Sequence, residues 1–159
     1  MIAGLALACT EAFTSSSSEL AAGLQKETRD IERRLRQSFR IGMGSVILSL
    51  EKAMQQFGQP NWDGYNALPV SEETHWAAER FLRQLPLNVP LPTVGAEPDG
   101  DLTLEWYRGP YRTLSVSINA HGAIHFSALL GQTESCGTIE FSDDVSPDIL
   151  QLIRRVYAA

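Results

Sequence analysis

Residues 61–71, NWDGYNALPVS, separate a helix-rich part of this 159-residue chain from a strand-rich part. Asp63-Gly64 is a strong turn dipeptide, and Trp62 and Tyr65 flank it with large apolar side chains that each carry one polar atom. The sequence therefore predicts a turn anchored by its aromatic residues.

The helix after this turn is predicted over residues 71–85. Ser71 can cap it, and two acidic residues then occupy the first turn, where the helix dipole favours negative charge. Its apolar positions fall on one face, and Trp76, Arg80 and Arg83 fall on the opposite face. A tryptophan there is anomalous. Intramolecular packing is the simpler interpretation, and a cation–π cluster or a partner surface are the alternatives.

The length and composition predict one soluble domain with its own hydrophobic core, since 43% of the residues are hydrophobic. Cys9 and Cys136 lie far apart without ligands at metal spacing, so neither a disulfide framework, a metal site nor a cofactor is expected. The apolar start MIAGLALACTEAF imitates a lipoprotein export signal, but it is short and has no basic segment. We expect a cytoplasmic protein without a membrane span.

Charge differs between the two halves. Residues 1–58 contain 7 Lys and Arg and 6 Asp and Glu, whereas residues 59–159 contain 6 and 13, which gives net charges of +1 and −7. We interpret residues 1–58 as an N-terminal helical segment and residues 59–159 as an α+β domain, together forming one compact unit. The acidic second half is a poor candidate for direct nucleic-acid binding.

The first predicted helix runs from a cap within Ser15 to Ser18 to about Arg40. Its narrow apolar stripe alternates spacings of four and three: Leu24, Thr28, Ile31, Leu35 and Ser38. Such a stripe can pair with another helix, including that of a second copy in a dimer. A separate face carries Arg29, Arg33, Arg36 and Arg40. Solvation is the simpler role for that face, and contact with an acidic protein or with nucleic acid are the alternatives.

Gly42 and Gly44 are expected to break or kink this helix, and Ser45 can cap a second one. The second helix has a broad apolar face, typical of a core helix: Val46, Ile47, Leu50, Ala53, Met54 and Phe57. After residue 85 a proline-rich connector follows, with an edge strand expected at Thr93 to Ala96.

From Asp99 onward the hydrophobic period is two, which predicts half-buried strands joined by short turns. Three such segments include Leu102 to Tyr107, Leu114 to Ile118 and Ile124 to Leu130, with a further strand near residues 137–141. Ser146-Pro147 then begins a C-terminal amphipathic helix that covers the sheet. The fold class is therefore α+β, with N-terminal helices, one further helix and an antiparallel meander of four to five strands covered by helices.

The runs NWDGYNALPVSEETHWAAERFLRQLP and PDGDLTLEWYRGPYRTLSVSINAHGAIHFSALLG, about residues 60–131, resemble an uncharacterised family of small bacterial proteins. That family pairs a W-D-G-Y turn with a P-D-G-x-x-x-L-E-W strand, here matched by Trp62, Asp63, Gly64, Tyr65 and Trp106. The resemblance implies an α+β fold and a bacterial or mobile-element origin, and it supplies no catalytic residue. Asn66 departs from the family, in which glycine is commoner at that position.

Catalysis is the less favoured interpretation. The polar face of the sheet is predicted to carry Glu105, His125 and three serines, but alternation alone places such residues on a solvated face, and no nucleophile elbow or phosphate loop accompanies them. His121 with His125 lacks a third metal ligand. Asp63 with His75 could form an acid/base pair, although Asp63 is better explained as a turn former.

The favoured interpretation is a non-catalytic protein–protein interaction module: an inhibitor, an antitoxin-like neutraliser or an accessory subunit. Aromatic and arginine side chains are the usual anchors of interfaces. The candidate anchors are the four arginines of the first helix together with Trp76, Arg80, Arg83, Tyr107 and Tyr111. The partner is expected to be a protein, and the acidic half suits one with a basic, nucleic-acid-binding surface. The alternatives are an enzyme or ligand-binding protein that uses Glu105 and His125, and nucleic-acid contact through the arginine-rich helix.

Overall fold

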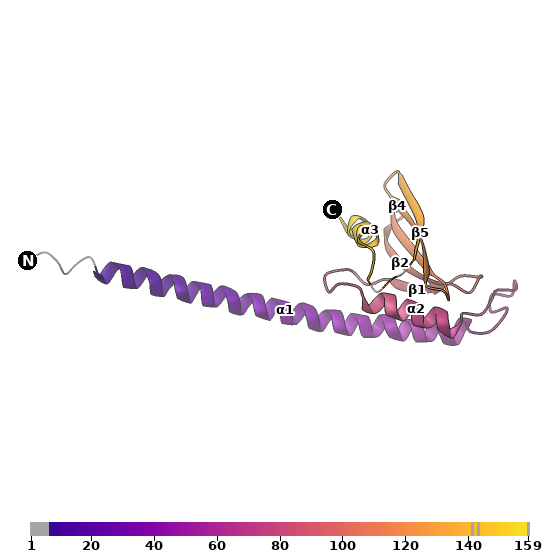
Figure 1. The fold of residues 1–159 in the computed structure, drawn as a ribbon, viewed down its shortest axis with the longest axis horizontal. Helices are drawn as coiled ribbons and strands as arrows, with labels where there is room; N and C mark the ends of the chain where they lie inside the picture. The colour runs from indigo at the N-terminus through magenta and orange to yellow at the C-terminus, as the bar shows by residue number, and fades with distance from the viewer. Residues whose placement is uncertain (1–6, 141, 143, 159) are drawn as a thin grey trace, which may run out of the picture. The chain divides into compact units, whose positions relative to one another are not determined.

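A computed structural model describes residues 7–140, 142 and 144–158, with side chains from residue 20 onward (Figure 1). The start of the apolar N-terminal run and Phe141 lie outside these residues. The chain divides into two compact units, residues 1–39 and residues 40–159, and the helix α1 (Leu7–Phe57) crosses that boundary. The α+β class predicted from the sequence is confirmed.

The predicted break at Gly42 and Gly44 is wrong, because α1 continues through both glycines. Glycine in a helix costs about 1 kcal/mol relative to alanine, which a packed helix tolerates. A Cβ on Gly42 would lie 2.8 Å from Leu91 Cδ1, so the missing side chain permits close packing there. Ser45 does not cap a new helix, since its Oγ donates to the Ile41 carbonyl at 3.3 Å in the preceding turn. The serines at 15–18 likewise lie inside α1 rather than at its start.

The rest of α1 supplies a face to the core of the second unit. Val46, Leu50 and Ala53 are buried there, whereas Ile47, Met54 and Phe57 are partly exposed. The helix α2 (Glu72–Arg83) begins as predicted, since the Ser71 side chain accepts from Thr74 N–H at 3.1 Å. Its buried residues form one face: Thr74, Ala77, Ala78, Phe81 and Leu82.

A single antiparallel sheet follows, with strand order β1-β2-β3-β4-β5. Its strands are β1 (Thr93–Ala96), β2 (Leu102–Gly109), β3 (Arg112–Ile118), β4 (Ala123–Leu130) and β5 (Thr133–Glu140). Buried and partly exposed residues alternate along β2 and β3, as the period of two predicted. Trp106 is fully buried and donates its Nε1–H to the Pro90 carbonyl at 2.7 Å.

The helices α2 and α3 (Pro147–Tyr157) pack on the sheet, with α2 contacting β2 and β3, and α3 contacting β2, β3 and β4. Ser146 caps α3 and Pro147 occupies its first turn, as predicted. The buried face is Ile149, Leu152, Ile153 and Val156. The apolar stripe read from the sequence, which includes Ile149, Ile153 and Val156, also contains Leu150 and Tyr157, but these two are partly exposed. The opposite face of the sheet carries the polar residues.

The side chain of Asp63 accepts two of the hydrogen bonds that hold the turn at residues 61–67. Its Oδ1 accepts from Tyr65 N–H at 2.7 Å and from Ala67 N–H at 3.1 Å. The carboxylate is therefore a turn former, as expected, rather than half of an acid/base pair with His75. Trp62 anchors the turn through its Nε1–H, which donates to the Leu68 carbonyl at 3.0 Å.

The two other notable residues of the turn are Tyr65 and Asn66. Tyr65 is 87% exposed, so it does not anchor the turn as predicted. Asn66 has a φ of 70°, in the left-handed region that glycine favours and asparagine tolerates better than most residues. Asparagine can therefore adopt the backbone conformation that this turn requires at position 66.

Replacing Asp63 with alanine should destabilise the chain by about 1–3 kcal/mol, because two backbone N–H groups lose their acceptor. Asp63→Asn keeps a side-chain oxygen at that place and should retain most of the stability. Urea unfolding followed by circular dichroism measures both. Equal losses for the two variants would show that the negative charge, rather than the acceptor, stabilises the turn.

Candidate functional site

A groove lies in the second unit between α2 and the turn that joins β3 to β4. Its volume is about 430 Å³, and its lining residues are Glu73, Trp76, Ala77, Arg80, Ala120, His121 and Gly122. The four α2 residues are spaced by three, one and three, so they form one face of the helix beside its buried face. Trp76 is 65% exposed. Intramolecular packing, the simpler expectation for Trp76, is therefore not what the structure shows.

The turn wall of the groove is held in place by Asn119. Its Oδ1 accepts from His121 N–H at 3.0 Å and from Ala123 N–H at 2.9 Å. Gly122 has a φ of 78°, and a Cβ there would lie 3.6 Å from an Arg80 Nη, so the turn lies against the guanidinium. Both walls of the groove are thus positioned by the fold.

Charges of both signs lie in the groove. Hydrogen bonds from its own backbone N–H and from Ser71 lower the pKa of Glu73, so this carboxylate is ionised at neutral pH. Arg80 lies two turns further along α2 on the same side. The His75 ring packs edge-on against the Trp76 indole, with centroids 6.2 Å apart. An apolar indole between opposite charges can bind a protein surface of mixed character.

The other predicted anchors are not brought to this groove. Arg83 pairs with Glu79, with Nε 2.9 Å from Oε1. Tyr107 and Tyr111 are 57% and 67% exposed, but they lie near the β2–β3 hairpin, at the other end of β3 from the groove. The sequence-predicted aromatic set therefore divides between two ends of the sheet.

The arginines of α1 are all exposed. Arg29, Arg33 and Arg36 belong to the first unit, and Arg40 begins the second. Arg33 Nη1 lies 3.4 Å from Asp30 Oδ1, an exposed pair within one helix turn that contributes little stability. This arrangement fits the solvated face expected for the stripe.

On the polar sheet face, Glu105 and His125 are not neighbours. Glu105 is in register with Ser115, which faces Ser127, so His125 lies two strands away and two residues before that register position in β4. With strands about 4.8 Å apart, the two residues are roughly 10 Å or more from each other. The His125 Nδ1 instead lies 2.8 Å from Thr138 Oγ1. The acid/base pair of the catalytic alternative is therefore not assembled.

The polar face also contains a group that sequence reasoning missed. The Glu97 carboxylate accepts hydrogen bonds from the hydroxyls of Thr103 and Ser117. Burial raises the pKa of Asp101 above its usual value of 3.8, the Asp99 and Glu97 carboxylates raise it further, and His125 opposes them. The sequence does contain a sign of this group, since the EPDGD turn holds the three carboxylates of Glu97, Asp99 and Asp101. These carboxylates come together because β1 pairs with β2 in a hairpin.

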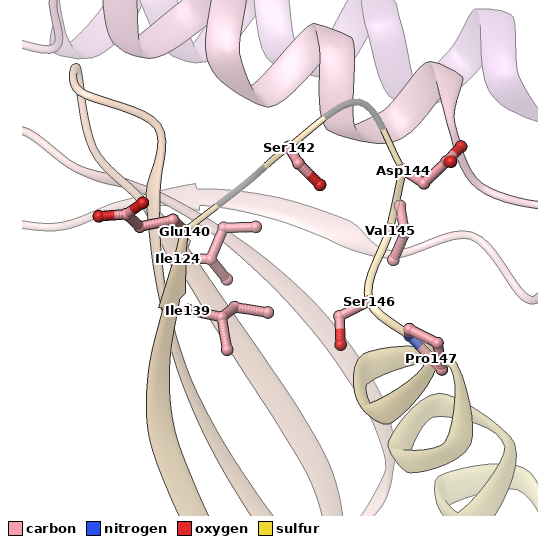
Figure 2. Close-up of a pocket in the computed structure, with 8 residues that line it drawn as sticks. All are labelled: Ile124, Ile139, Glu140, Ser142, Asp144, Val145, Ser146 and Pro147. Carbon is pink, nitrogen blue, oxygen red and sulfur yellow. The ribbon is translucent and has the colours of Figure 1, made fainter.

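A second cavity, of about 320 Å³, lies where β4 begins and β5 ends, beside the start of α3 (Figure 2). Ile124, Ile139 and Val145 form its apolar part. Figure 2 shows the carboxylates of Glu140 and Asp144 pointing away from the cavity in opposite directions. These acids therefore do not converge on a cation.

Within residues 7–140, 142 and 144–158, no group of three His, Cys, Asp or Glu side chains could hold a metal ion. In the same residues no helix is long and apolar enough to cross a membrane. No protein-family profile, curated protein or solved structure matches the chain. The resemblance to the W-D-G-Y family thus stays a prediction.

Because Asp101 has a raised pKa, the folded chain binds more protons than the unfolded chain from pH 3.8 up to the raised value. Stability contributed by this group therefore falls as pH rises through that window. Asp101→Asn should increase the free energy of unfolding at pH 7 by at most about 1 kcal/mol, since solvent screens a partly exposed carboxylate. Urea unfolding between pH 4 and pH 7 measures the effect.

Glu134→Gln is the control for this variant, because it removes one negative charge from an exposed position on β5. It should leave the pH dependence close to that of the unmodified chain. An Asp101→Asn variant that is less stable at pH 7 and keeps the same pH dependence would contradict the assignment.

Proposed function

We propose that this chain is a non-catalytic protein–protein interaction module that binds a partner protein through the Trp76 groove. The observation that carries the proposal is the 65% exposure of Trp76 in a groove whose two walls are both fixed by the fold. Tryptophan and arginine dominate interface hot spots, and here they lie one helix turn apart at positions 76 and 80.

Burial of the Trp76 indole against a partner protein would be favourable in free energy compared with its exposure to water. Burying an exposed indole removes a large apolar area from water, at about 25 cal/mol per Å². A preformed groove also lowers the ordering cost of association. These contributions together are typical of a hot spot, for which truncation costs about 2 kcal/mol or more.

The biological role that we infer is that of an inhibitor, an antitoxin-like neutraliser or an accessory subunit in a bacterial or mobile-element setting, acting in the cytoplasm. Residues 59–159 carry a net charge of −7, which favours a partner with a basic surface such as a nucleic-acid-binding protein. Sign complementarity raises the association rate and excludes acidic partners.

The test is affinity purification of the tagged full chain from its native host after nuclease treatment, comparing the unmodified chain with Trp76→Ala and Arg80→Glu. A stoichiometric protein should copurify with the unmodified chain, and Trp76→Ala should weaken its retention by about 30-fold, the equivalent of 2 kcal/mol. Tyr65→Ala, which truncates an 87% exposed aromatic residue elsewhere, is the matched control and should retain the partner.

Circular dichroism should show that Trp76→Ala keeps its fold, because most of the side chain is already in water. Retention of every partner by Trp76→Ala and Arg80→Glu would overturn the groove assignment. Loss of all bound material on nuclease treatment would instead favour nucleic-acid contact through the arginines of α1.

A further inference from the structure

The N-terminal half of α1 exposes large apolar side chains. Leu20, Leu24, Ile31 and Leu35 are 68%, 64%, 53% and 56% exposed, respectively. The described part of the first unit, residues 7–39, is one helix and cannot cover its own apolar side. A single helix of this kind gains stability mainly by packing its apolar face on another element.

The exposed apolar side has coiled-coil spacing. Leu24, Thr28, Ile31, Leu35 and Ser38 alternate spacings of four and three, so they occupy d, a, d, a and d positions of a heptad repeat. Thr28 suits a buried seam despite its hydroxyl, because Oγ1 already donates to the Leu24 carbonyl at 2.8 Å. Arg29, Arg33 and Arg36 fall at b and f positions, away from this seam. The stripe is therefore as wide as a two-stranded coiled coil requires.

We propose that the seam pairs with the same segment of a second copy, in antiparallel orientation. With Leu24 facing Leu35 of the second copy, Thr28 faces its Ile31, and twofold symmetry repeats both layers. In this register the small residue Ser38 faces Ala21. Every leucine and isoleucine at an a or d position then has a counterpart of suitable size.

Charge selects this orientation. The g positions carry Glu27 and Arg34, and in the antiparallel register each Glu27 faces Arg34 of the other copy, which gives two complementary pairs. In a parallel, in-register pair, Glu27 at g would instead face Glu32 at e of the second copy. Symmetry would create this repulsive pair of like charges two times. A shallow hollow of about 310 Å³ on this side of the helix is lined by Glu27, Arg34 and the seam residue Ile31, among others.

The experiment is sedimentation equilibrium of the full chain over a concentration series in low salt under reducing conditions. The unmodified chain should dimerise. Glu27→Arg and Arg34→Glu should each weaken dimerisation by about tenfold or more, because like charges replace both complementary pairs. The double variant Glu27→Arg/Arg34→Glu should restore it, and an equimolar mixture of the two single variants should form a heterodimer.

Arg33→Glu, at an outward f position of the same helix, is the control and should dimerise like the unmodified chain. Circular dichroism checks that helix content is unchanged, since the substituted side chains are exposed. The proposal would be wrong if the chain stayed monomeric up to a protein concentration of about 100 μM, because weak specific complexes have dissociation constants in the micromolar range. Tighter dimerisation of Glu27→Arg would also overturn it, because that substitution relieves only the parallel pairing.

Discussion

Two backbone hydrogen bonds of the segment after α1 set the arrangement of the second unit. Val70 N–H donates to the Phe57 carbonyl at 2.9 Å, and Leu68 N–H donates to the Pro98 carbonyl at 2.8 Å. One bond ties the segment to the end of α1, and the other ties it to the β1–β2 turn. The backbone also approaches closely at Gly100, where a Cβ would lie 3.0 Å from the Pro69 carbonyl. Because buried backbone groups must be paired, this short stretch determines where α2 begins relative to the sheet.

The position of α2 in turn creates the Trp76 groove. One side of α2 is committed to the core through Phe81 and Leu82, so the adjacent side faces the turn between β3 and β4. Trp76 lies on that adjacent side and cannot reach the core without rotating the helix. The exposed indole is thus a consequence of the same packing that stabilises the unit. The partner that we propose would cover this indole.

The two proposals concern different surfaces with different physics. The Trp76 groove offers one large aromatic anchor between opposite charges, whereas α1 offers leucine, isoleucine and threonine at the spacing of a coiled-coil seam. An antiparallel dimer would carry two copies of the groove. A partner with two binding sites would then gain effective concentration without any new contact, provided that its geometry allowed both to engage.

Local chemistry in the sequence determined most elements of this fold. Alternation predicted β2, β3 and β4, Ser71 and Ser146 marked the starts of α2 and α3, and Asp63-Gly64 marked the turn. These features depend on neighbouring residues alone. Three further features of the fold depend on contacts between residues that are far apart in the chain. Leu91 packs against Gly42 of the unbroken α1, Ser117 donates to Glu97, and the 119–122 turn forms a groove with Trp76. Only the tertiary structure decided these, because contacts between distant residues leave no periodic signal in a single sequence.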